Sequence, residues 1–215
     1  MKELLIIRHG EASHLARGIT GGWSDSDLTE LGCKQAIRTG LVLADMLGGR
    51  TFEVYSSDQP RAVQTAQEMA RSLPAQMHFT PALRELNNGI AANLTLEEAA
   101  RVAAPLTEPT IDWLPYPQAE TWREMSQRVH AFLDGLLARD MQTAVLVTHG
   151  HAGVAAVFWW LRLGPEHWSR ISFHFCPCSI TYLGIDAWDE RTIYKLNDTS
   201  HLSDIPSRFD RPDFR

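Results

Sequence analysis

Short apolar runs alternate with longer amphipathic stretches along most of the chain. Residues 4–7 and 144–147 are continuously apolar between polar neighbours, a pattern typical of strands buried on both faces of a parallel sheet. Residues 52–55 and 77–80 carry weaker strand signals. Near the C-terminus, two further apolar segments around a polar turn predict a hairpin, at residues 179–185 and 191–196.

Amphipathic stretches with marked ends predict the helices. After Thr29, a candidate N-cap, apolar or small residues recur every three or four positions until Gly48 stops the pattern. Pro60 suits the first turn of a second helix, expected to run to about residue 73. Capping boxes that start at Thr95 and Thr121 begin two more helices, and a last helix is expected over residues 150–163.

Strands that alternate with helices at this spacing predict an α/β fold. We expect three layers, α/β/α, with helices on both faces of a mostly parallel sheet. Residues 86–122 interrupt the alternation and contain four prolines, so we interpret them as an inserted substrate cap. The prediction is a single domain over residues 1–197, followed by a polar C-terminal tail at 198–215 that is either loose or draped over the domain.

The composition is that of an ordinary globular protein, with 44% hydrophobic and 21% charged residues in a chain of 215. The net charge is -6, and no stretch concentrates Lys and Arg, so we expect neither a nucleic acid nor a membrane as a partner. The longest apolar run, residues 152–161, is too short to span a bilayer, and the N-terminus lacks the apolar region of a signal peptide. Three cysteines do not suggest a disulfide framework, so a cytoplasmic location is expected.

Cationic side chains and histidines follow three of the predicted strands. Arg8 and His9 come directly after the first strand, and His149 comes after the strand at 144–147. Arg61 lies in the first turns of the helix that follows the second strand. Because the carboxyl ends of parallel strands meet at one edge of a sheet, we expect these four side chains to converge.

Two arginines and two histidines in one pocket favour a bound anion, because their charge is costly when nothing neutralises it. A tetrahedral dianion fits the fixed donor geometry of guanidinium groups best. Gly10 and Gly150 follow the two histidines and let a ligand approach the backbone closely. A neutral imidazole can attack phosphorus and form a labile phosphohistidine, so the pattern predicts phosphoryl transfer.

Five sequence blocks resemble the histidine phosphatase superfamily, which includes cofactor-dependent phosphoglycerate mutases and many small phosphatases. In order along the chain, the blocks are LLIIRHGEA, GGWSDSDLTELG, VYSSDQPRAVQTAQ, LRE and VLVTHGHAG. They extend from residue 4 to about residue 160, and five blocks in the correct order are hard to produce by chance.

The resemblance implies that His9 is the phosphorylated nucleophile and that Glu85, in the LRE block, gives a proton to the leaving oxygen. That role requires a carboxyl group protonated at neutral pH, so we expect burial to raise the pKa of Glu85. The arginines carry the charge that a metal carries elsewhere, so neither a metal nor a cofactor is expected. The expected phosphoryl and substrate contacts are Arg8, Arg61, His149, Gly10, Gly150, Gly22 and His151.

The sequence departs from the family at two places. Ala12 and Leu15 stand where members often carry Ser or Thr and then Asn, so two polar phosphate contacts are missing. Ser13 or His14 could replace them. The residues after the acid, 89–93, also differ from the G-x-W-E-G that members often carry.

The composition of the cap favours a phosphatase over a mutase. It has one basic residue, Arg101, against five acidic ones, and a mutase would need further cations for a carboxylate and a second phosphate. Its apolar and aromatic residues suit an organic leaving group; they are Ile111, Trp113, Leu114, Tyr116 and Trp122. We therefore expect a small phosphate ester with a weakly charged or apolar alcohol as substrate. Mutase-type transfer and a non-catalytic phosphoryl-binding module are the alternatives.

Three further features have two interpretations each. Glu11 is a second candidate for the acid, because it lies two residues from His9. His151 either touches the substrate or is structural. Trp159 and Trp160 fit a helix packed in the core, and their exposure would instead indicate a homodimer contact.

Overall fold

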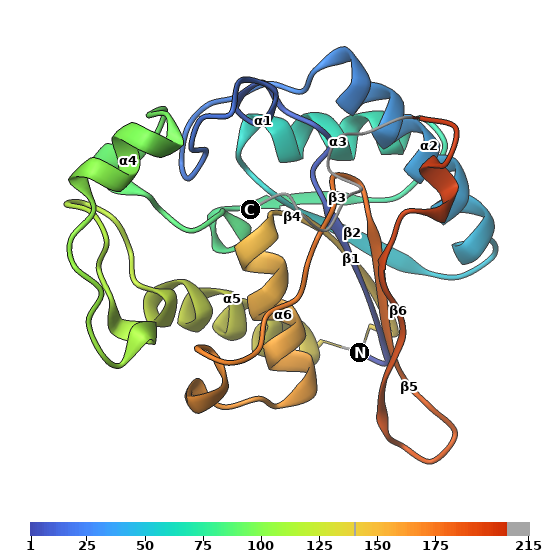
Figure 1. Ribbon diagram of the computed structural model, residues 1–215. Helices are drawn as coiled ribbons and strands as arrows, with labels where there is room; N and C mark the ends of the chain where they lie inside the picture. The colour runs from blue at the N-terminus through green and yellow to red at the C-terminus, as the bar shows by residue number, and fades with distance from the viewer. Residues whose placement is uncertain (140, 206–215) are drawn as a thin grey trace.

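The apolar runs of the sequence form the strands of one six-stranded sheet in a computed structural model that describes residues 1–139 and 141–205 (Figure 1). The strand order is β3-β2-β4-β1-β5-β6. Pairing is parallel from β3 through β1 and antiparallel for β1 with β5 and for β5 with β6. The strands are β1 Glu3–Arg8, β2 Phe52–Ser57, β3 Met77–Thr80, β4 Thr143–Thr148, β5 Ile180–Ile185 and β6 Arg191–Asp198.

Six helices accompany the sheet. They are α1 Ser13–Arg17, α2 Glu30–Leu47, α3 Pro60–Ala70, α4 Leu96–Val102, α5 Trp122–Leu137 and α6 Gly150–Leu161. Single 3₁₀ turns lie at η1 Pro81–Leu83, η2 Gly89–Ala91, η3 Thr110–Asp112, η4 Pro165–His167 and η5 Ser200–Leu202. The predicted hairpin near the C-terminus is confirmed as β5 and β6.

Alternating side chains of the inner strands build two apolar cores, one on each face of the sheet. Leu5 and Ile7 of β1 pack with residues of α2 and α3, whereas Leu4 and Ile6 pack with residues of α5 and α6. Figure 1 shows these helix pairs on opposite sides of the strands. The predicted three-layer α/β/α architecture with a mostly parallel sheet is confirmed.

The predicted helix ends are confirmed where the sequence supplied a cap. The Thr29 side chain accepts a hydrogen bond from the Gly32 amide, and capping boxes are present at both Thr95 and Thr121. The last helix is shorter than predicted, because Arg162 adopts a left-handed conformation with φ 57° and ends it at Leu161. The sequence did not predict α1, a helix of five residues that is too short to show a period.

Two segments lie outside the three layers in the part of the chain that the structure describes: the predicted cap and the residues after β6. The predicted cap at residues 86–122 contains η2, α4 and η3, and α4 lies beside the sheet, away from α2 (Figure 1). Within the predicted tail at residues 198–215, Asp198 ends β6 and Leu202 is buried against Ala36 and Cys178. Residues 206–215 lie outside the described residues. Among the described helices, none has the length and apolar character needed to cross a membrane.

Strand order and helix placement create a crevice at the carboxyl ends of β1 and β4. These two strands are neighbours, yet α2, which follows β1, and α6, which follows β4, pack on opposite faces of the sheet. Chain segments diverge at such a switch point and leave room for a ligand. The residues directly after these strands, His9 and His149, are therefore brought together.

Candidate active site

His9 leaves the end of β1 and its ring is held in one protonation state. Its backbone amide donates to the Thr148 carbonyl at 2.8 Å, which ties the ends of β1 and β4 together. The ring Nδ1 lies 2.7 Å from the Gly10 carbonyl, which only accepts, so Nδ1 carries the proton. The Nε2 of His9 accepts from the Nε of Arg61 at 3.3 Å. Nε2 therefore presents a lone pair, as a nucleophile requires.

Electrostatics keep this imidazole neutral. Burial, followed by the charges of Arg61 and Arg8, holds the pKa of His9 well below its ordinary value of 6.5. The side chain is 2% exposed. A neutral ring with Nδ1 protonated leaves Nε2 ready to attack an electrophile at any physiological pH.

Arg61 is fixed by carbonyl groups of the loop before α2. Its NH1 donates to the Ser24 carbonyl and its NH2 to the Gly22 carbonyl, each at 2.8 Å. Gly22 adopts φ 51°, a conformation that favours glycine and turns this carbonyl toward the guanidinium. Burial lowers the pKa of Arg61 to about 10, so the guanidinium stays charged at neutral pH.

Arg8 and His149 each hold a buried polar atom without a partner among the described residues. Arg8 donates through NH1 to the Phe175 carbonyl at 2.5 Å, but its buried Nε has no partner there. In His149, Nε2 lies 2.9 Å from the Ser57 hydroxyl, and Nδ1 is buried and has no hydrogen-bond partner among the described residues. Buried polar atoms without partners are costly, and an anion would satisfy the Arg8 Nε and, in the Nδ1-protonated form of the ring, His149 Nδ1.

Burial among positive charges keeps His149 neutral. It is fully buried, with its ring centroid 5.1 Å from that of His9. Burial, then the charges of Arg61 and of a protonated His9, place the pKa of His149 well below 6.5. It can therefore donate a hydrogen bond through Nδ1 without adding a third charge to the pocket.

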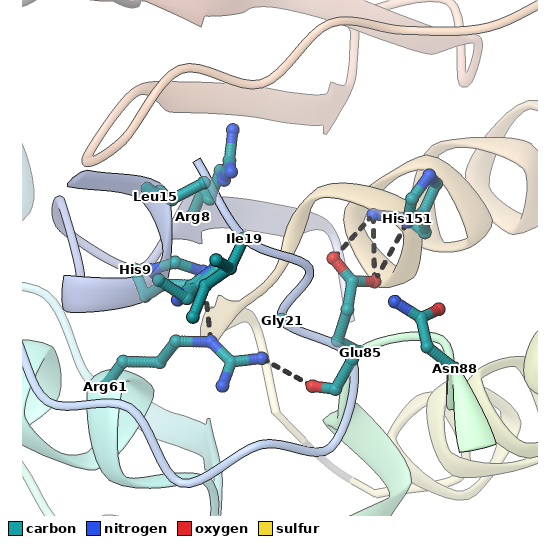
Figure 2. A pocket seen from close by; sticks show the side chains of 11 residues that line it. Arg8, His9, Leu15, Ile19, Gly21, Arg61, Glu85, Asn88 and His151 are labelled. Carbon is teal, nitrogen blue, oxygen red and sulfur yellow. Dashed lines mark hydrogen bonds and ion pairs between the residues drawn. The ribbon is translucent and has the colours of Figure 1, made fainter. Parts of the chain in front are cut away.

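Glu85 lies across the pocket beside the N-terminus of α6 (Figure 2). The His151 amide donates to both carboxylate oxygens, at 3.1 and 3.3 Å, and the His151 ring Nδ1 lies 3.4 Å from Oε1. The main chain of Glu85 is held on both sides, because its amide donates to the Gln59 side chain and its carbonyl accepts from Trp23. His151 is thus a neighbour of the carboxylate as well as a pocket residue.

The expected raised pKa of Glu85 is wrong. Burial raises it, but His151, the Leu86 amide and Arg61 together bring the pKa of Glu85 below its ordinary value. The sequence did not show these hydrogen bonds and charges, which favour the ionised form of the carboxyl group.

The pocket between these side chains has a volume of about 160 Å³. Figure 2 shows Arg61 and Glu85 facing it from different elements. Its lining consists of Arg8, His9, His14, Leu15, Ile19, Gly21, Gly22, Arg61, Glu85, Asn88 and His151. Of the predicted contacts, Gly10, Gly150 and His149 do not line it: Gly10 packs against Gly32, Gly150 lies beside Glu85, and the ring of His149 packs against that of His9.

Sequence reasoning missed part of this lining. Ile19, Gly21 and Asn88 were not predicted, because they come from irregular segments whose position depends on the fold. Of the two replacements considered for the missing contacts, His14 lines the pocket and Ser13 does not. The described residues contain no group of three or more His, Cys, Asp or Glu side chains that could hold a metal ion.

Glu11 is held away from the pocket. Its Oε1 accepts from the Thr29 hydroxyl at 2.9 Å, at the start of α2, and Glu11 is absent from the pocket lining. Trp159 and Trp160 are 4% and 1% exposed, so the core interpretation holds for both.

The structure corrects the picture of the cap in two ways. Three of its five carboxylates have arginine partners, in the pairs Glu97–Arg101, Asp112–Arg123 and Glu120–Arg128, so its acidic charge is largely balanced. The predicted aromatic set does not line the pocket. Trp122 contacts a pocket residue, with its ring edge-to-face on His151 at 4.7 Å. Besides the histidines and glycines, the uncharged residues that line the pocket are Leu15, Ile19 and Asn88.

The fold and the paired histidines define a phosphoryl-transfer type of site, and comparison with known proteins identifies its family. The family model described as histidine phosphatase superfamily (branch 1) matches residues 4–199, so the chain belongs to this superfamily. Both the predicted family and the enzyme class, a histidine-type phosphatase, are confirmed.

Similar proteins are named either as phosphatases or as mutases. The chain is 29% identical to a putative phosphoserine phosphatase 2 of Hydrogenobacter thermophilus, over 95% of this chain and 100% of that protein. It is equally 29% identical to the probable phosphoglycerate mutase GpmB of Yersinia pestis, over 96% of this chain and 97% of that protein.

Solved structures share the fold. A mycobacterial glucosyl-3-phosphoglycerate phosphatase bound to VO3 has a TM-score of 0.79 at 22% identity, covering 93% of this chain and 100% of that one. A phosphoserine phosphatase of Entamoeba histolytica, bound to 3-phosphoglyceric acid, has a TM-score of 0.74 at 23% identity, covering 94% and 100%.

Proposed function

We propose that the protein is a metal-independent phosphomonoesterase that works through a phosphohistidine on His9. The observation that carries the proposal is the set of buried donors around a neutral nucleophile. Arg8 lines the pocket together with His9, and the ring centroid of His149 lies 5.1 Å from that of His9. The Arg8 Nε and the His149 Nδ1 are buried without a partner among the described residues, and the Nε2 of His9 holds a lone pair. A phosphoryl group at Nε2 would accept from both donors and would neutralise Arg8 and Arg61.

The reaction takes place in two displacements. The Nε2 lone pair of His9 attacks phosphorus, the ester P–O bond breaks, and the leaving oxygen takes a proton from Glu85. Water then attacks phosphorus, the P–N bond breaks, and the Glu85 carboxylate takes the proton of that water. Inorganic phosphate leaves and His9 returns to its neutral state.

Glu85 must be protonated for the first displacement, although its pKa lies below the ordinary value. A bound phosphoryl group places negative charge beside the carboxylate and offsets the effect of Arg61, both of which raise its pKa. An ester that binds as its monoanion also brings the required proton with it. The charge balance of the occupied pocket therefore supports the acid role.

The walls beyond the phosphoryl site support a substrate with a weakly charged or apolar alcohol. Leu15, Ile19 and Asn88 are uncharged, and the described lining holds no lysine and no arginine besides Arg8 and Arg61. Those two guanidinium groups are engaged by the transferred phosphoryl group. A second phosphate or a carboxylate on the substrate would thus lack a cationic partner, which argues against mutase-type transfer.

The test is hydrolysis of an aryl phosphate in the presence of a chelator. We expect turnover without added metal, and we expect His9→Ala to abolish it; the exposed His174→Ala is the matched control. Loss of activity with the chelator would refute metal independence, and activity in His9→Ala would refute the nucleophile. A faster conversion of 3-phosphoglycerate to 2-phosphoglycerate than release of phosphate would establish the mutase instead.

A further inference from the structure

His14 faces the same pocket as His9, and the two displacements above give it no role. It lies on α1 and is 6% exposed. Its ring centroid is 5.8 Å from that of His9, with the planes tilted by 53°. A hydrogen bond of ordinary length, about 2.8 Å between heavy atoms, can bridge from this ring to an oxygen attached beside His9.

Hydrogen bonds through Ser26 link His14 to Arg61. The Ser26 hydroxyl oxygen lies 3.4 Å from NH1 of Arg61 and 2.8 Å from Nδ1 of His14. A guanidinium group only donates, so the hydroxyl accepts from Arg61 and its own hydrogen is available for Nδ1. With Nδ1 as the acceptor, the proton of His14 lies on Nε2.

Gly21 packs directly against the ring of His14. A Cβ atom on residue 21 would lie 2.8 Å from both Cδ2 and Nε2, a steric clash with the ring. Gly21 does not have a positive φ, so close packing, and not its backbone conformation, requires glycine here. His14 lines the pocket, and no hydrogen bond to Nε2 is found among the described residues.

His14 is an uncharged donor. Burial, then the charges of Arg61 and Arg8, lower the pKa of His14 to about 3. A neutral N–H group binds a phosphoryl oxygen without adding to the repulsion between the two guanidinium groups.

We propose that His14 is a further substrate-binding residue, whose Nε2–H donates a hydrogen bond to a non-bridging oxygen of the phosphoryl group bound at His9. This inference rests on the proposed function for the position of that group. In this arrangement, His14 makes the polar contact that Leu15 cannot make. Ser26 positions the proton of His14.

The test measures competitive inhibition by inorganic phosphate in two variants of one residue. Gln places an amide N–H where Nε2–H of His lies, whereas Phe keeps the ring and removes the donor. We expect His14→Phe to raise the inhibition constant of phosphate roughly tenfold or more, and His14→Gln to keep it within about threefold. Gly21→Ala, which clashes with the ring of His14, should raise it as His14→Phe does. The control is His174→Phe, an exposed histidine, which should leave the constant unchanged.

A second measurement needs no variant. Long-range proton–nitrogen NMR correlations of the wild-type protein at pH 7 should show His14 protonated at Nε2, with the signal of that proton shifting when phosphate is added. An Nδ1-protonated ring, or an Nε2 proton that does not respond to saturating phosphate, would overturn the proposal. So would an unchanged inhibition constant in a folded His14→Phe variant. The NMR measurement needs no turnover, so its outcome is separate from failure of the His9 nucleophile, which the turnover of His9→Ala reveals.

Discussion

At the scale of single residues, Glu85 is subject to two opposing influences. Burial favours its neutral form, whereas His151, the Leu86 amide and Arg61 favour the carboxylate and prevail. The acid role thus depends on the arrival of the substrate. The contribution of Glu85 to kcat should therefore increase with the basicity of the leaving group.

We expect Glu85→Gln to affect alkyl and aryl phosphates very differently. An alkoxide is a poor leaving group, so loss of the acid should lower kcat for an alkyl ester by about 10²- to 10⁴-fold. A nitrophenolate leaves without a proton, so the aryl ester should lose little. Glu97→Gln, on the exposed face of α4, is the matched control. Equal losses for both esters would contradict the role of Glu85 as proton donor.

The pH profile follows from the low pKa of Glu85 in the free enzyme. At neutral pH the carboxylate is already ionised, so the catalytic proton arrives with an ester whose second phosphate ionisation lies near pH 6. We therefore expect kcat/KM for an alkyl ester to fall as the pH rises from 6 to 8. A profile that is flat over this range, measured with the wild-type enzyme, would contradict this source of the proton.

The chemistry of individual residues was only partly predictable from the sequence. Strand ends placed Arg8, His9 and His149 at one edge of the sheet, because parallel strands share that edge. The charge state of Glu85 was not predictable, since it depends on hydrogen bonds from a residue far along the chain, His151. The position of His14 likewise depends on α1, which is too short for a periodic signal.

At the scale of elements, glycines inside two helices differ in what surrounds them. In α2, a Cβ on Gly40 would lie 2.7 Å from the Met69 carbonyl oxygen and 2.8 Å from the Met69 Cα, so α2 and α3 are in close backbone contact. In α5, a Cβ on Gly135 would have no neighbour within 4 Å. The lack of a side chain at Gly40 therefore allows α2 and α3 to pack in close contact.

Replacement of these two glycines by alanine should shift stability in opposite directions. Gly135→Ala gains helix propensity and should stabilise the protein by about 0.5–1 kcal/mol. Gly40→Ala forces the α2 and α3 backbones apart and should destabilise it by about 1–3 kcal/mol. Urea unfolding of both variants measures the difference. A stabilising Gly40→Ala would show that the close approach of the two helices is not required.

Elements were the best predicted level, because their signals are local. The capping residues Thr29, Thr95 and Thr121 marked three helix starts correctly. The contents of the cap were harder to predict. Arg123 and Arg128 lie outside it in sequence and balance its carboxylates, and the irregular path of the cap leaves its aromatic residues out of the pocket.

At the scale of the whole molecule, the site makes folding depend on pH. The folded protein keeps three histidines neutral, His9, His14 and His149, because burial and the arginines lower the pKa of each. The unfolded chain binds protons at these histidines below about pH 6.5. Their folded pKa values are lower than their unfolded ones, so stability is present above pH 6.5 and is lost as the pH falls.

For His14 alone, a shift of the pKa from 6.5 to about 3 corresponds to a loss of about 2 kcal/mol in unfolding free energy between pH 7 and pH 5. His14→Gln should therefore lose less stability over this interval than the wild-type protein, by about that amount. Urea unfolding at both pH values provides the comparison, with the exposed His174→Gln as control. An equal loss in wild type and His14→Gln would show that His14 is not kept neutral by the fold.

The central claim is that the imidazole of His9 carries the phosphoryl group during turnover. Rapid mixing of the enzyme with a phosphate ester, a quench in alkaline denaturant that preserves phosphohistidine, and peptide mass spectrometry test it most directly. We predict one phosphoryl group on the peptide that contains His9, at Nε2, which disappears on brief treatment with acid. An enzyme that turns over substrate but yields no phosphorylated peptide, or one phosphorylated at another residue, would contradict the account.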